Sequence, residues 1–230
     1  VDIFKNPHKE KSIAPSTQTS KFLRSTAVIT VGTLASRVLG LFRDMVMASA
    51  FGMCAAMDAF FIASMIPNLF RKLFGEGALS ASLIPALSDY KERRSHDDAR
   101  ALVASIFRRV TVILSILTVV SIAVVWLGSP QYFGVESGQS WHSFQIYFTT
   151  LAPLVFFLCL GGLQAGVLNT YDSFALPALV PAIHNVVWIG GILFAVHSGM
   201  AGETINAQIE IMCIAILFGG ILQWVLQLQG

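Results

Sequence analysis

Seven ionisable residues lie inside two otherwise apolar stretches of this sequence, at about 23–50 and 57–87. They are Arg37, Arg43, Asp44, Asp58, Arg71, Lys72 and Glu76. An ionisable side chain at membrane depth costs several kcal/mol unless it faces protein, water or an opposite charge. The planar fork of an arginine matches a phosphate group bidentately. These residue types therefore indicate either internal ion pairing or an aqueous cavity that binds an anion.

The first stretch has a polar face when it is wound as a helix with about 100° per residue. Counted from Gly32, this face covers roughly 20° to 140°. It contains Arg43, Ser36, Gly40, Thr33, Asp44 and Arg37. Gly32, Ser36 and Gly40 also form a small-xxx-small row, which allows close helix approach. The face could therefore serve helix packing, a cavity, or each at a different depth.

The second stretch repeats this pattern. The residues that share an arc of roughly 60° are Ser64, Asn68, Arg71 and Gly75. Lys72 and Glu76 are spaced i,i+4 and could neutralise each other. Pro67 removes a backbone hydrogen bond in mid-helix and predicts a kink. Bent helices beside ionisable groups are typical of transporter sites.

Two interpretations of these charges stay open. In the first, the charges pair internally and only fix helix packing. For the acidic residues and Lys72, this interpretation has about the same weight as the second. In the second, they line an anion-binding cavity. The second is favoured for Arg37, Arg43 and Arg71, because the arginines outnumber the acidic partners expected at the same depth.

The composition favours a membrane protein. Of the 230 residues, 55% are hydrophobic and 12% are charged, against about 25% charged in soluble domains. The net charge of +2, without an interleaved basic and aromatic patch, argues against a nucleic-acid partner. Cys54, Cys159 and Cys213 are far apart and have no metal-ligand spacing, so no metal site is expected.

The predicted fold is an all-α integral membrane protein. A polar, disordered arm is expected over residues 1–20, followed over 21–230 by one transmembrane bundle. Its six helices are predicted at about 23–50, 57–87, 101–127, 144–168, 176–197 and 207–228. The chain begins at Val1 and ends within an apolar helix, so a fragment is expected.

The distribution of lysine and arginine predicts the orientation. Basic residues gather in the arm and at 91–109, whereas the loops at 51–56, 128–143 and 198–206 contain none. Basic loops stay on the cytoplasmic side of a membrane. The amino terminus is therefore predicted to be cytoplasmic. His184 is expected to be a satisfied buried histidine, and Trp188 a packing or interfacial residue.

Three segments together resemble the MurJ/MviN family. They are Ser36-Arg-Val-Leu-Gly-Leu-Phe-Arg-Asp44, Met57-Asp-Ala-Phe-Phe61 and Ile66-Pro-Asn-Leu-Phe-Arg-Lys-Leu-Phe-Gly-Glu-Gly-Ala-Leu-Ser80. The resemblance is strong over about 21–95. It continues more weakly through Leu168-Asn-Thr-Tyr171 and Phe174-Ala-Leu-Pro-Ala178. A run of motifs this long is far more specific than a single short signature.

The resemblance implies one six-helix bundle of a two-bundle exporter fold, with the second bundle missing from this chain. It also implies a flippase that moves lipid II, an undecaprenyl-diphosphate-linked disaccharide-peptide, from the inner to the outer leaflet of the bacterial cytoplasmic membrane. By motif, the cavity arginines of the family fall on Arg37, Arg43 and Arg71, and its acidic positions on Asp44, Asp58 and Glu76. Asn169 matches a polar cavity position.

The partners expected from the resemblance are the lipid-linked precursor, membrane lipids and the second bundle. No cofactor is expected. An ion gradient or the membrane potential could drive transport, but the cation site of the family lies largely in the second half. The alternatives are an exporter of another lipid-linked oligosaccharide or small molecule, a membrane enzyme acting on a polyprenyl diphosphate, and a scaffold. An enzyme is disfavoured because no nucleophile–base pair or carboxylate cluster occurs.

Overall fold

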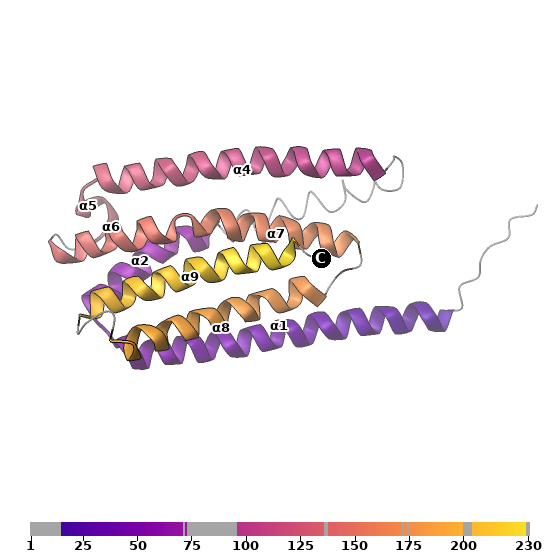
Figure 1. The fold of residues 1–230 in the computed structure, drawn as a ribbon, viewed down its shortest axis with the longest axis horizontal. Helices are drawn as coiled ribbons and strands as arrows, with labels where there is room; N and C mark the ends of the chain where they lie inside the picture. Colours follow the sequence, from indigo (N-terminus) through magenta and orange to yellow (C-terminus); the bar gives the residue numbers. More distant parts are fainter. Residues whose placement is uncertain are drawn as a thin grey trace, which may run out of the picture.

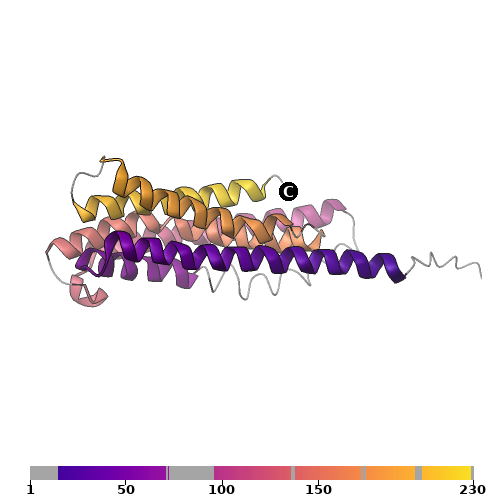
Figure 2. The same ribbon diagram turned by 90° about the horizontal axis from the view of Figure 1, so that it is seen from below.

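The computed structural model describes residues 15–70, 72, 96–135, 138–171, 173, 175–199 and 204–228. The elements are α1 (Pro15–Phe51), α2 (Ala55–Phe70), α4 (His96–Leu127), α5 (Pro130–Phe133), α6 (Gln139–Leu151), α7 (Leu154–Thr170), α8 (Ala175–His197) and α9 (Ile205–Gln227). The long helices run side by side in an elongated bundle (Figures 1 and 2). The predicted all-α membrane fold is confirmed.

Four spans among the described residues are long and apolar enough to cross a membrane. They are Ala101–Leu127, Gln139–Thr170, Ala175–His197 and Ile205–Gln227. Helix α2 is apolar but has only 16 described residues. The remainder of the predicted 57–87 helix lies outside the described residues, apart from Lys72.

Helix α1 is longer than predicted. It begins at Pro15 and spans 37 residues, so it extends into the segment for which we predicted a disordered arm. Proline suits the start of a helix because the first helical N–H groups have no intrahelical partner. The rest of the predicted arm, residues 1–14, is outside the described part of the chain.

The predicted single helix at 144–168 is instead two helices, α6 and α7, with a break at Ala152 and Pro153. Pro153 has no N–H to donate, so the regular i→i−4 ladder cannot pass through it. Helix α7 starts with the tighter i→i−3 bonds from Val155 N to Ala152 O and from Phe156 N to Pro153 O, at 3.2 and 3.1 Å. The predicted loop at 128–143 also contains the short helix α5.

The α6–α7 pair forms the centre of the bundle, whereas α4 lies along its edge (Figure 1). In the most apolar window of each span, 61% of Gln139–Thr170 is buried but only 17% of Ala101–Leu127. The core between α2, α6 and α9 contains Phe60, Phe144, Tyr147, Phe148 and Met212. The outer face of α4 is therefore left for lipid or another protein segment.

Glycines allow α8 to approach both α1 and α9 closely. A Cβ on Gly191 of α8 would collide with the Cβ of Ala215 in α9. A Cβ on Gly32 of α1 would lie 2.8 Å from the Cβ of Ala178 in α8. The small-residue row on α1 thus packs at Gly32, whereas Ser36 and Gly40 line a cavity. Of the three possibilities that the sequence left open, the structure shows the third: the face packs against α8 at one depth and lines a cavity at another.

Candidate functional site

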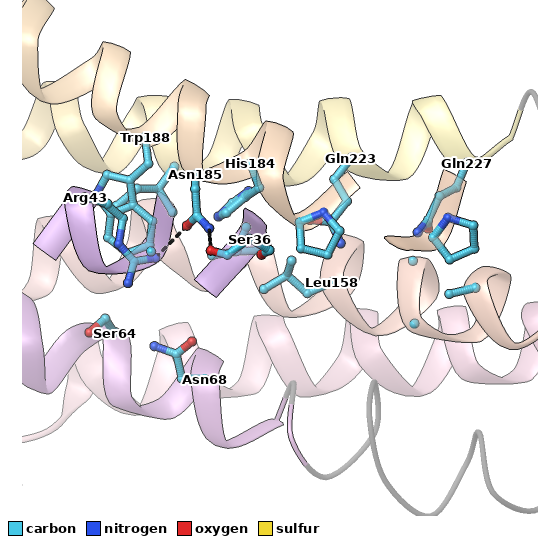
Figure 3. Close-up of a pocket in the computed structure, with 18 of the residues that line it drawn as sticks. Ser36, Arg43, Ser64, Asn68, Leu158, His184, Asn185, Trp188, Gln223 and Gln227 are labelled. Carbon is cyan, nitrogen blue, oxygen red and sulfur yellow. Dashed lines mark hydrogen bonds between the residues drawn. The ribbon is translucent and has the colours of Figure 1, made fainter. Parts of the chain in front are cut away.

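A cavity of about 580 Å³ opens between α1, α2, α7, α8 and α9 (Figure 3). Polar side chains from all five helices reach its wall. They are Ser36, Arg43, Ser64, Asn68, Asn169, His184, Asn185, Gln223 and Gln227. The cavity combines one arginine with amides, hydroxyls and a histidine, inside a bundle that exposes many large apolar side chains.

Arg43 is the charged centre of this wall. Its Nη1 donates to Asn185 Oδ1 at 3.0 Å. Its Nε and Nη2 donate to Asp44 Oδ1 at 3.0 and 2.7 Å. The guanidinium carbon lies 4.2 Å from the centre of the Trp188 ring, within the range of a cation–π contact. Four contacts therefore fix the orientation of the guanidinium, and further N–H groups on its terminal nitrogens are left for a ligand.

Asn185 of α8 joins this helix to α1 through hydrogen bonds next to Arg43. Its side chain is buried, accepts from Arg43 and donates from Nδ2 to the backbone carbonyl of Ser36 at 3.0 Å. Gly40 lies beside it, since a Cβ there would be in ordinary contact with the Asn185 amide nitrogen, at 3.7 Å. Figure 3 shows this chain of hydrogen bonds from Arg43 through Asn185 to Ser36. One uncharged amide thus sets both the helix register and the position of the charge.

Comparisons with known proteins identify the family of this chain. The family model described as lipid II flippase MurJ matches residues 47–230. The chain belongs to the MurJ family. The lipid II flippase MurJ of Burkholderia cenocepacia is 36% identical over 208 residues, which cover 89% of this chain and 39% of that protein. The protein of the same name from Thermosipho africanus is 33% identical and covers 80% of this chain and 38% of its own length.

A solved structure of lipid II flippase MurJ in an inward closed conformation has a similar fold. It gives a TM-score of 0.71 at 27% identity, over 88% of this chain and 41% of that one. The chain therefore spans about two fifths of the length of the MurJ proteins that it matches.

The structure brings some of the predicted site residues together. Arg43, Asn68 and Asn169 line the cavity. Asp44 is not a lining residue but forms an ion pair with Arg43. Internal pairing and a cavity position, which we weighed as alternatives, both apply to Arg43. Whether these residues bind a substrate stays a prediction.

The other predicted residues are not among the described lining residues of the cavity. Arg37, Asp58 and Lys72 are exposed and are not part of the cavity lining. Arg37 was at the edge of the predicted polar face, at roughly 140°, whereas the lining residues of α1 lie between roughly 20° and 80°. Arg71 and Glu76 lie outside the described residues.

Several wall residues were not predicted from the sequence. Asn185, Gln223 and Gln227 are uncharged residues within apolar runs, so the search for ionisable groups passed over them. His184 and Trp188 were assigned to packing, yet both line the cavity. A search for amides at i,i+4 spacing within apolar helices would have found the two glutamines. Among the described residues, His, Cys, Asp and Glu form no group of three that could hold a metal ion.

Replacing Asn185 by leucine is expected to destabilise the bundle by about 1–3 kcal/mol, because Arg43 Nη1 loses a buried acceptor. The check is the midpoint of thermal unfolding of the full-length protein in detergent. The matched control is Val186→Leu, at the exposed neighbouring position. Equal midpoints for Asn185→Leu and the control would contradict the bridging role.

Proposed function

We propose that the full-length protein moves lipid II from the inner to the outer leaflet of the bacterial cytoplasmic membrane by alternating access. The observation that carries the proposal is Arg43, which is held with its guanidinium facing a polar cavity between apolar helices. Membership of the MurJ family supports it, because its relatives are named lipid II flippases.

The physical requirements of such transport match the cavity. A diphosphate with an attached disaccharide-peptide cannot cross hydrocarbon without replacement of its hydration. Arginine N–H groups replace water around the phosphate oxygens, and amides and hydroxyls replace it around neutral polar groups. The polyprenyl tail stays in the lipid, so only the head group needs the cavity. The protein acts by binding and conformational change and needs no covalent step.

The remaining parts of the proposal concern the full-length protein. A second bundle closes the open side of the cavity and rocks against this one. Arg37 and Arg71 join Arg43 in contacting the diphosphate, although Arg37 lies outside the cavity lining of this bundle. The supporting charged and polar residues are Asp44, Asp58, Asn68, Lys72, Glu76 and Asn169. The amino terminus is cytoplasmic, no cofactor is used, and an ion gradient or the membrane potential supplies the energy.

The test is complementation in bacterial cells depleted of their own lipid II flippase. Expression of the full-length protein is expected to restore growth and cell shape. Transport is checked in the same cells by the appearance of lipid II in the outer leaflet, measured as cleavage by an externally added hydrolase specific for it. A well-expressed, membrane-inserted protein that restores neither growth nor cleavage would contradict the proposal and favour an exporter of a different lipid-linked oligosaccharide.

A further inference from the structure

The cavity has a second polar end, away from Arg43. Gln223 and Gln227 lie one helical turn apart on α9 and both line the cavity. They face α7 at Gly161, where a Cβ would lie 3.1 Å from Gln227 Oε1 and 3.7 Å from Gln223 Nε2. Figure 3 shows the two glutamines at the opposite end of the cavity from Arg43, with His184 and Leu158 between. The missing side chain at Gly161 thus leaves space for the Gln227 amide at this end, with the Gln223 amide beside it.

The amide oxygen of Gln227 is buried and has no partner in the described part of the chain. The residue is only 5% exposed, and its Oε1 has no hydrogen-bond partner among the described residues. Buried polar atoms in folded proteins nearly always have such a partner, in the protein, in water or in a ligand. Since Gln227 also lines the cavity, a turn of its side chain would bring this unpaired acceptor to the contents of the cavity, which could then complete its hydrogen bonding.

The chemistry of this end differs from that of the Arg43 end. Arg43 is the one lysine, arginine, aspartate or glutamate in the described lining. A primary amide carries no charge, donates from nitrogen and accepts at oxygen. It therefore complements hydroxyl and acetamido groups, which also both donate and accept, whereas a phosphate can use only its N–H groups. Leu158, Pro181 and Ile216 supply apolar surface in the same cavity, as suits a sugar ring.

We infer that Gln223 and Gln227 form a subsite for the saccharide that is bonded to the diphosphate. This inference rests on the proposed function, because it places two parts of the lipid II head group at the two ends of the cavity. Arg43 holds the charged part of the head group. The glutamine amides hold the neutral part and distinguish a glycan-bearing lipid from a bare polyprenyl diphosphate.

The test compares two ligands on the purified full-length protein in nanodiscs. The probes are undecaprenyl diphosphate carrying the disaccharide-peptide and bare undecaprenyl diphosphate, with dissociation constants measured by quenching of tryptophan fluorescence. The double variant Gln223→Leu/Gln227→Leu is expected to bind the glycan-bearing lipid about tenfold more weakly, as for the loss of one or two hydrogen bonds. Its affinity for the bare lipid is expected to remain that of the wild type.

A second variant guards against misfolding of the first. Gly161→Ala keeps both glutamines but places a methyl group against their amides, and it is expected to give the same selective loss. Gln208→Leu is the matched control, since Gln208 lies on α9 but is not a lining residue. It is expected to change neither affinity.

Three results would overturn the inference. Equal weakening of both lipids would show that the glutamines do not recognise the glycan, while the proposed function would stand. Unchanged affinities in the double variant and in Gly161→Ala would show that the amides bind only water, again without affecting the proposed function. Failure of the wild-type protein to bind either lipid would overturn both.

Discussion

Replacing Arg43 by alanine in the full-length protein is expected to abolish rescue of cells depleted of their lipid II flippase. The change removes the one arginine of the described cavity lining and leaves Asn185 Oδ1 and Asp44 without their partner. A hydrogen bond to a charged group contributes about 1.5–3 kcal/mol, so binding of a diphosphate is expected to weaken by roughly 10- to 100-fold. Growth, and the dissociation constant for undecaprenyl diphosphate, measure the effect.

Two variants make the Arg43 result specific. Arg43→Lys keeps the positive charge but cannot reproduce the fork that contacts both Asn185 and Asp44. It is expected to rescue growth only in part. Arg109→Ala removes a charge from an exposed position on α4, outside the cavity, and is expected to rescue fully. Full rescue by Arg43→Ala at wild-type membrane abundance would show that Arg43 is not needed to hold the head group.

Replacing Gly191 by leucine is expected to have the largest effect on stability. A Cβ at this position already collides with the Cβ of Ala215, so α8 and α9 must separate to admit a larger side chain. Overpacking of a core costs about 1–3 kcal/mol and sometimes more, and the effect here is expected at or above the top of that range. A fall in the yield of folded protein and in its thermal midpoint measures the loss.

The adjacent glycine provides a matched control. A Cβ on Gly190 would meet nothing within 4 Å, and the residue is exposed. Gly190→Leu inserts the same side chain one position away and improves helix propensity. It is expected to leave yield and thermal midpoint unchanged. Similar losses from both leucines would mean that the close approach of α8 to α9 does not limit stability.

The polar face of α1 could be predicted from the sequence because the helical period alone determines which side chains share a side. Arg43, Ser36 and Gly40, at the centre of the predicted arc, line the cavity, whereas Arg37 at its edge is exposed. The same argument placed Ser64 and Asn68 together on α2, and both are found in the cavity wall. Long apolar runs likewise predicted the membrane helices, since span length depends on bilayer thickness.

The partners of these residues could not be predicted in this way. Arg43 and Asn185 are 142 residues apart in sequence, so their contact depends on how α1 packs against α8. A lone asparagine in an apolar run gives no local sign that it will bond to a distant arginine. The same holds for the two glutamines of α9, because their contact with Gly161 depends on how α9 packs against α7. The hydropathy of 144–168 gives no sign of the interruption at Ala152 and Pro153, although the missing N–H of Pro153 is itself a sequence signal for one.

That interruption has a consequence for how the molecule fits its bilayer. Gln139–Thr170 contains 32 residues, which as one straight helix would measure about 48 Å, against a hydrocarbon core of about 30 Å. An unbroken helix of this length would have to tilt steeply, and would tilt its neighbours with it, or deform the surrounding lipid. Because the ladder is interrupted at Pro153, the junction of α6 and α7 is the place where this span can bend to fit the hydrocarbon core.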